Sequence, residues 1–282
     1  MQKITPFLWY DGQAEEAAHF YTSLFKNSKV TSVSPMMTNF ELNGLQFVGL
    51  NGGPHFTFTN STSLFVTCNN KDEISSLWKS LSDEGTILMD LGNYPWSEYY
   101  GWVNDRYGLS WQLFLGDKDQ QICPSFLFAN QQFGKGESAI NLYSNLFPPS
   151  KTLNMVRYGE AFPGLEHNIQ FAEFELAGQS FMLMESHIPH EFDFNEAFSF
   201  FIACADQNEV DYYWEKLIAN GGQESKCGWL KDPYGVSWQV IPNLLMQLMS
   251  SPDSENKQSA WEAMLKMNKI DCQTLQDAYD GK

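Results

Sequence analysis

The spacing of apolar residues changes along the chain between a strand-like and a helical period. Residues 4–10 form a short apolar run typical of a strand, and residues 14–25 then place their apolar side chains on one helical face after Asp11, the expected N-cap. A second helical pattern follows an expected N-cap at Asn70. The stretches around these helices alternate or are continuously apolar and are bounded by Gly, Asn and Pro, which predicts half-buried strands.

This order of elements occurs twice. The segments AEEAAHFYTSLF, FELNG and GWVNDRYGLSWQLF recur later, in the same order, as GESAINLYSNLF, FELAG and GWLKDPYGVSWQVI. A duplication of this length indicates whole domains rather than a solenoid of short units. We therefore expect tandem domains over residues 1–116 and 120–243. Each would contain paired βαβββ modules in an α+β fold, with helices on one face of a sheet whose other face can curve.

The copies differ in length at two places. The second copy carries a Gly/Pro-rich insertion around residues 157–168, and the first carries one around residues 90–100. Such insertions predict loops. We expect them where loops would cover a pocket.

A helical tail is predicted after the second copy, over residues 251–282. Apolar side chains within residues 261–265 form a short helical face, and Asp271 can cap a final helix that carries Leu275. We expect these helices to dock on the body of the protein.

Composition and charge argue against some classes of binding partner. The 282 residues carry a net charge of −17 at pH 7, so most of the surface would repel nucleic acid or an anionic membrane. Five scattered cysteines without a CxxC pair argue against a disulfide framework and a zinc knuckle. No apolar stretch is long enough for a membrane helix, and no signal-like N-terminal pattern is present. These features favour a cytoplasmic, soluble protein.

Long collinear strings resemble a known family. ITPFLWYDGQAEEAAHFYTSLF, FELNG, LNGGPHFTF and CGWLKDPYGVSWQVIP are similar to PhnB-like proteins. These are also described as 3-demethylubiquinone-9 3-methyltransferase domains, within the vicinal oxygen chelate superfamily of glyoxalase and bleomycin-resistance proteins. The resemblance implies glyoxalase-like domains whose curled mixed sheets form cups. It also implies an intramolecular pseudo-dimer, compatible with a monomer in solution; further self-association stays open.

Enzymes of that superfamily usually hold a divalent metal ion in the cup. The corresponding positions here are residues 4–6 and 122–124, which offer no ligand, and Ser63 and Ser199 where a histidine would lie. The terminal-strand position, a glutamate in metal-binding relatives, corresponds to Gln112 and Gln239. One neutral amide per cup is too little for a divalent ion, so we predict no metal.

The methyltransferase description predicts S-adenosylmethionine, but the sequence does not support that cofactor. A nucleotide-binding doubly wound fold needs a glycine-rich turn between a strand and its helix, and the GxG at residues 134–136 follows a loop and lacks a third glycine. We predict no cofactor.

Strand alternation identifies candidate ligand contacts. If Trp111 and Trp238 pack against the helices, Gln112 and Gln239 must face the cup, where they could hydrogen-bond a ligand; surface exposure is the alternative. Trp102 and Trp229 could line the same cups around a planar ligand, or pack in the core.

Three further residues are weaker candidates. His55 and His190 each follow a proline at matching positions and could orient a ligand or act as a general base; the simpler interpretation is that they cap turns or pack. Arg157, beside the second-copy insertion, could bind an anionic ligand. The Asp residues of the DRYG and DPYG segments, Asp105 and Asp232, are expected to close Asx-turns.

Two hypotheses about function follow. The first is a metal-independent small-molecule binder whose aromatic cups enclose a ligand of unknown identity. The second is an enzyme of the same superfamily, of lyase, isomerase or dioxygenase type, that uses His55 or His190 as an acid or base. Fold analogy alone does not decide between them.

Overall fold

The computed structural model describes residues 2–251 and 253–282, so Met1 and Pro252, the latter within the predicted tail, lie outside the described residues. The chain folds into two compact units. Unit 1 combines Met1–Thr5 with Ser199–Lys282, and unit 2 is Pro6–Phe198.

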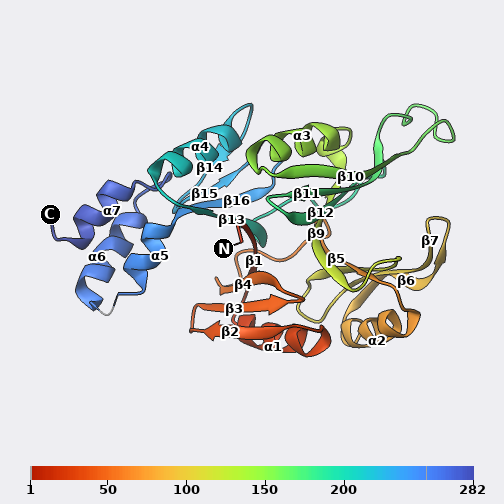
Figure 1. Cartoon of the computed structure of the whole chain (residues 1–282), viewed down its shortest axis with the longest axis horizontal. Helices are drawn as coiled ribbons and strands as arrows, with labels where there is room; N and C mark the ends of the chain where they lie inside the picture. Colours follow the sequence, from red (N-terminus) through yellow and green to blue (C-terminus); the bar gives the residue numbers. More distant parts are fainter. Residues whose placement is uncertain (1, 252) are drawn as a thin grey trace. The chain divides into compact units, whose positions relative to one another are not determined.

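The helices and strands follow the order predicted for both copies (Figure 1). The first copy contains β1 (Ile4–Tyr10), α1 (Ala14–Leu24), β2 (Lys29–Val33), β3 (Met37–Leu42), β4 (Leu45–Asn51), β5 (Thr62–Cys68), α2 (Lys71–Leu81), β6 (Thr86–Tyr94), β7 (Ser97–Asn104) and β8 (Ser110–Leu115). The second contains β9 (Gln121–Phe128), the short 3-10 helix η1 (Asn130–Gln132), α3 (Gly136–Leu146), β10 (Ser150–Arg157), β11 (Ile169–Leu176), β12 (Gln179–Glu185), β13 (Phe198–Cys204), α4 (Gln207–Ile218), β14 (Gln223–Glu224), β15 (Trp229–Lys231) and β16 (Ser237–Pro242). The predicted βαβββ modules are confirmed.

Unit 2 contains a mixed sheet that draws on both copies. Its strand order is β10-β11-β12-β9-β5-β8-β7-β6. The antiparallel pairing of β5 with β9, in which Ser63 lies opposite Ser125, joins a module of the first copy to a module of the second. We call this the composite sheet. The other strands of unit 2 pair in the order β1, β4, β3, β2, with β1 and β4 parallel.

The helix that opens each copy is capped from a distant strand. Asp11 is not the N-cap of α1; instead the Asn51 side chain, at the end of β4, accepts a hydrogen bond from the Ala14 amide at 2.9 Å. In the second copy Glu185, at the end of β12, accepts from the Gly136 amide at 2.7 Å in the same way. The cap therefore depends on tertiary packing, which local sequence does not reveal.

The Glu185 cap should matter more than its Asn51 counterpart. Glu185 is buried, and its second carboxylate oxygen accepts from the Ile169 amide at 2.7 Å. Replacing Glu185 with alanine leaves buried amides unpaired, so we expect a loss of roughly 2–4 kcal/mol of unfolding free energy, against about 1 kcal/mol for Asn51→Ala. Urea unfolding of both variants measures this difference; equal losses would contradict the argument.

Unit 1 carries the predicted C-terminal helices. β13 pairs in parallel with β16, and β16, β15 and β14 pair antiparallel. The chain then continues through α5 (Asn243–Met249), α6 (Ser254–Met264) and α7 (Cys272–Tyr279). As predicted, Asp271 caps α7, because its side chain accepts from the Thr274 amide at 2.7 Å. None of the described helices is both long enough and apolar enough to cross a membrane.

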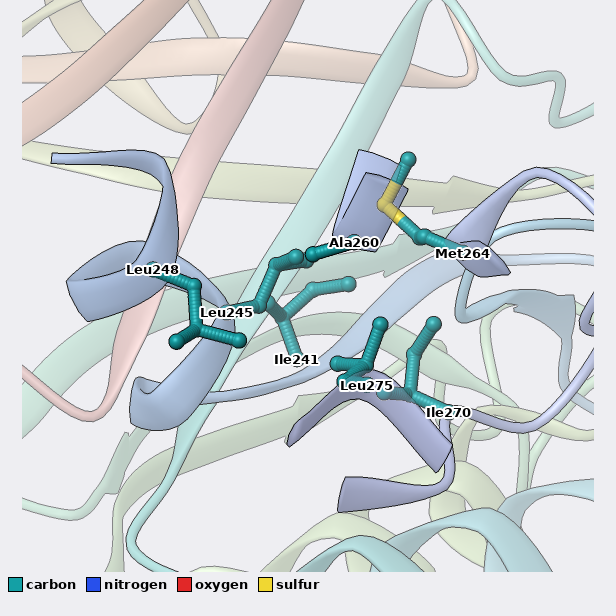
Figure 2. Close-up of a cluster of buried hydrophobic side chains, with 7 residues drawn as sticks. All are labelled: Ile241, Leu245, Leu248, Ala260, Met264, Ile270 and Leu275. Atoms are coloured by element: carbon teal, nitrogen blue, oxygen red, sulfur yellow. The ribbon is translucent and has the colours of Figure 1, made fainter. Parts of the chain in front are cut away.

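These tail helices pack on one face of β16 and β13 (Figure 2). The buried cluster comprises Ile241, Leu245, Leu248, Ala260, Met264, Ile270 and Leu275, with Phe201 of β13 packed against it. Of the apolar face predicted over residues 261–265, Met264 is buried but Leu265 is exposed. The helices therefore cover sheet side chains that would otherwise meet solvent.

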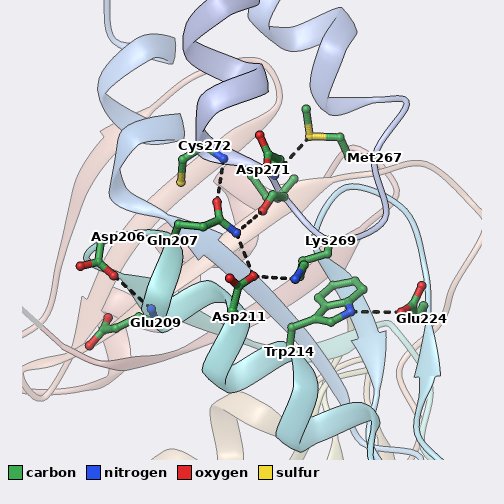
Figure 3. Close-up of polar contacts among 11 residues, drawn as sticks. Asp206, Gln207, Glu209, Asp211, Trp214, Glu224, Met267, Lys269, Asp271 and Cys272 are labelled. Atoms are coloured by element: carbon green, nitrogen blue, oxygen red, sulfur yellow. Dashed lines mark hydrogen bonds and ion pairs between the residues drawn. The ribbon is translucent and has the colours of Figure 1, made fainter.

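Polar contacts fix the tail to the start of α4 (Figure 3). The Gln207 amide donates to the Ile270 carbonyl at 3.2 Å and accepts from the Cys272 amide at 2.8 Å. Lys269 forms an ion pair with Asp211 at 2.6 Å. Gln207 thus pairs with the Cys272 amide, which α7 leaves unpaired at its first turn, and with a carbonyl of the segment before that helix.

Candidate ligand-binding face

The composite sheet has one face toward helix α2 and an opposite, inner face. At Gly101 of β7, an added Cβ would lie 2.5 Å from the Trp78 ring of α2, so this face packs against the helix. Because successive side chains of a strand point to opposite faces, Tyr100 and Trp102 point to the inner face. Phe65 belongs to the same buried cluster as Tyr100.

The inner face is curled. Phe65 on β5 and Phe171 on β11 have ring centroids 6.1 Å apart. In the strand order, β9 and β12 lie between these strands, so on a flat sheet their main chains would be roughly 14 Å apart. The side chains can meet only because the sheet brings its halves toward each other, which agrees with the expected cup.

A small polar group lies among the apolar residues of this face. Gln112 is 2% exposed; its amide oxygen accepts from the Tyr100 hydroxyl at 2.6 Å, and its amide nitrogen donates to the Ser63 hydroxyl at 2.8 Å. The apolar residues around it fall into two sets. The buried ones are Phe65, Cys123 and Met182, and the partly buried ones are Met89, Tyr94, Trp102, Phe114 and Phe171. Burial raises the pKa values of the Tyr100 hydroxyl and the Cys123 thiol, so both are neutral at physiological pH.

The predicted alternation of Trp111 and Gln112 explains this placement. Trp111 is fully buried and stacks on Phe25, with ring centroids 5.4 Å apart and an interplanar angle of 19°. Its ring nitrogen donates to Asp105 at 2.8 Å. Gln112 therefore points to the inner face, and Trp102 lies opposite it in the β7–β8 register.

Gln239 of unit 1 has a different setting from Gln112. It is buried and donates to the Ser199 hydroxyl at 3.0 Å, and Trp229 lies opposite it in the register. Ile241, two residues along the strand and so on the same face, belongs to the tail cluster. The tail helices thus pack beside Gln239.

Both insertions lie on outer hairpins of the composite sheet. The first-copy insertion extends β6 and β7 into a longer hairpin rather than forming the expected loop. Near its tip, Trp96 is 52% exposed and stacks on Tyr94 at 5.2 Å, and Tyr94 meets Tyr100 of the inner face at 5.7 Å. The second insertion connects β10 to β11.

The remaining candidates lie in loops or at a strand end. His55 is exposed in the β4–β5 connection. His190 follows β12, shares a hydrogen bond with Ser186 at 2.9 Å and has a pKa below its usual value because of burial. Arg157 at the end of β10 forms an ion pair with Glu137 at 3.0 Å and donates to the His167 carbonyl. Within the described chain, the inner-face cluster contains none of these three residues.

Sequence reasoning missed several members of the inner face. Tyr100 lies in the first-copy insertion, where its spacing from Trp102 is the strand period that could have identified it. Ser125 is 1% exposed, and the structure gives its hydroxyl no hydrogen-bond partner. A lone serine in an apolar strand carries no pattern that would single it out.

The residues of this face do not fit a divalent metal ion. Among the described residues there is no group of three or more His, Cys, Asp or Glu side chains that could hold one. The oxygen donors nearby are serine hydroxyls and the Gln112 amide, which already accepts from Tyr100. A divalent ion takes several convergent ligands, so we derive no metal-dependent step.

The sheets also do not fit the nucleotide-type cofactor site of a doubly wound fold. Such a site lies at the end of a mostly parallel sheet. In the composite sheet, parallel pairs such as β5–β8 alternate with antiparallel pairs such as β7–β8. The sheets therefore give no support for methyl transfer from a cofactor bound in this way.

Comparisons with known proteins identify structures and sequences that are similar to this chain. Glyoxalase I from Zea mays is 12% identical, with 88% of this chain and 95% of that chain covered and a TM-score of 0.58. A PhnB protein from Bacillus cereus is 45% identical over 41% of this chain and 100% of its own, with a TM-score of 0.40. A protein from Staphylococcus aureus is 36% identical over 41% of this chain and 97% of its own, with a TM-score of 0.19. No curated protein matches.

The fold is glyoxalase-like, and two matches of one family model show a tandem duplication. A family model described as 3-demethylubiquinone-9 3-methyltransferase matches residues 2–114 and 120–241. The chain belongs to this family. The match ends at β16, so the tail helices lie outside it.

Proposed function

We propose that the protein is a metal-independent small-molecule binder that holds its ligand on the inner face of the composite sheet. The observation that carries the proposal is Gln112, a buried amide that hydrogen-bonds Tyr100 and Ser63 beside a cluster of aromatic and apolar side chains. Apolar sites with a few placed polar groups are the usual form of small-molecule sites.

The two insertions support this choice of sheet. Both lengthen outer hairpins of the composite sheet, and one carries the exposed Trp96 next to the inner-face cluster. In unit 1, by contrast, the corresponding glutamine lies beside side chains covered by the tail. We therefore propose that Gln112, rather than Gln239, contacts the ligand. The buried, unbridged cysteines Cys68, Cys123 and Cys204 suit the cytoplasm we propose as its location.

A fragment screen with matched variants tests the proposal. Wild type, Gln112→Met and Gln239→Met are screened by ligand-observed NMR and thermal shift, because ligand binding stabilises the folded state. We expect fragments whose affinity falls at least about tenfold in Gln112→Met and is unchanged in Gln239→Met. A screen without hits, or hits lost only in Gln239→Met, would contradict the proposal.

Elemental analysis tests the metal-independent part. Protein purified without chelator should contain no stoichiometric zinc, nickel or iron. A full complement of one of these metals, lost in Gln112→Met, would show that the site is a metal centre.

A further inference from the structure

We infer that the ligand of the inner face is an uncharged, planar molecule that presents a carbonyl-type acceptor oxygen to Ser63, Gln112 and Ser125. This inference rests on the proposed function and adds the chemical class of the ligand. Three observations lead to it: hydrogen-bond donors without acceptors, the absence of charge in the buried cluster, and aromatic rings around it.

The first observation is the balance of donors and acceptors. Gln112 uses its oxygen to accept from Tyr100 and one amide proton to donate to Ser63. Its second amide proton and the hydroxyl proton of Ser63 are then available. Ser125 lies directly across the β5–β9 ladder from Ser63, and opposed side chains of this kind have Cβ atoms about 5 Å apart. The donors of these residues converge on one small region.

The hydroxyl of Ser125 indicates that a ligand supplies a hydrogen-bond acceptor. It is buried, and within the described chain it has no hydrogen-bond partner. Buried polar groups are nearly always paired, and an unpaired one is destabilising, so a group that accepts its proton would bind with a gain. An oxygen that also accepts from Ser63 and the Gln112 amide fits a carbonyl, which has two lone pairs.

The second observation is charge. The buried residues of the inner-face cluster are Phe65, Tyr100, Cys123 and Met182, and none is charged at physiological pH. On β11, Glu173 alternates with Phe171 toward the same side, but it is already paired with Lys118 at 2.7 Å. A carboxylate or an amine placed beside Ser125 would be buried without a counterion, which is strongly unfavourable.

The third observation is ring geometry. Phe65 meets Phe171 at 6.1 Å and Phe114 at 5.7 Å, while Tyr94 and Trp96 stack at the hairpin. Flat faces in several orientations favour a planar ligand, because offset stacking and edge contacts add to simple burial.

Ring-matched probes test the class of ligand. One set is acetophenone, cumene and benzoate, and the other is coumarin, naphthalene and 2-naphthoate. Each set holds the ring size nearly constant while it changes an uncharged carbonyl to a hydrocarbon or an anion. We expect the carbonyl member of a set to bind about tenfold more tightly than its hydrocarbon, and the anion to bind most weakly.

A pair of serine variants locates the effect. Ser125→Ala should lower the affinity of the carbonyl probe about fivefold to tenfold without changing that of the hydrocarbon. Ser237→Ala is the matched control, because the Ser237 hydroxyl in unit 1 is also buried and unpaired in the structure. Neither variant removes a hydrogen bond that the structure records for these hydroxyls, so neither should lower the melting temperature.

The outcomes separate the inference from the proposed function. Hydrocarbons that bind as tightly as carbonyl probes, yet are lost in Gln112→Met, would overturn the ligand class and leave the site intact. Tight binding of the carboxylates would do the same. If none of the six probes binds, the inference fails, and the broader fragment screen decides the proposed function independently.

Discussion

Replacing Leu275 with aspartate is expected to release the C-terminal helices from unit 1. Leu275 is fully buried in α7 and packs in the cluster that includes Ile241 of β16. Shortening a buried leucine to alanine alone removes about 2–5 kcal/mol, and aspartate adds a buried charge with no counterion in that cluster. The part-buried hydrogen bonds of Gln207 and the partly exposed Lys269–Asp211 ion pair also join the tail to α4, but these few polar contacts do not replace the free energy of the apolar cluster.

Limited proteolysis and dye binding measure this release. In Leu275→Asp, cleavage within residues 251–282 should become at least about tenfold faster, since open segments are the ones proteases cut. A dye that fluoresces on apolar surfaces should report the newly exposed face around Ile241. Leu265→Asp is the control, because Leu265 belongs to the same tail but is 49% exposed. Equal behaviour of the two variants would show that the tail cluster does not hold the helices.

The tail also distinguishes the sheet of unit 1 from the composite sheet of unit 2. The family match ends before α5, so the cover over β16 is an addition to the shared fold. Without it, Ile241 and Phe201 would present apolar surface, which soluble domains rarely leave as a large open patch. In unit 2 the corresponding glutamine lies in a cluster ringed by partly buried aromatic residues instead. This contrast agrees with our proposal that the ligand face lies in unit 2, on a sheet to which both copies contribute strands.

Local patterns predicted the elements but not how they pair. The helical pattern after Asn70 correctly predicted α2, whose buried side chains are Ile74, Leu77 and Leu81, because an amphipathic face is a property of one segment. The pairing of β5 with β9 across the copies could not be predicted, since both copies carry nearly the same strand patterns. A choice between equivalent partners is decided by chain connectivity and packing of the whole molecule.

The sequence also predicted one residue of the candidate site but not the residues that contact it. Alternation with Trp111 identified Gln112, because one residue buried against helices fixes the direction of the next. The partners of Gln112 come from other strands: Tyr100 from an insertion and Ser63 from β5. His55 and His190 were candidates only because each follows a proline at a matching position. A Pro-His pair does not determine which way the histidine side chain points.

Asp105→Ala is expected to destabilise unit 2 by roughly 3–5 kcal/mol. One carboxylate oxygen accepts from the Tyr107 and Leu109 amides at 2.8 and 3.1 Å, and the other accepts from the Trp111 ring nitrogen at 2.8 Å. The variant leaves these donors unpaired in a region where Leu109 and Trp111 are fully buried. Asp117→Asn, which removes an exposed charge, should have almost no effect in the same urea titration.

The Asp105 carboxyl should also make stability depend on pH. Burial raises its pKa to about 6, although the hydrogen bonds from Trp111 and the turn amides oppose the rise. Because the folded state then holds the proton more tightly than the unfolded state, this group adds most stability in acid, and the contribution is lost as pH rises through about 6. Asp105→Asn keeps a similar shape and does not titrate. The difference in unfolding free energy between wild type and Asp105→Asn should therefore shrink from about pH 5 to about pH 8. A difference that grows with pH would show that the carboxylate form is the one the fold prefers, with the turn amides and Trp111 outweighing the effect of burial.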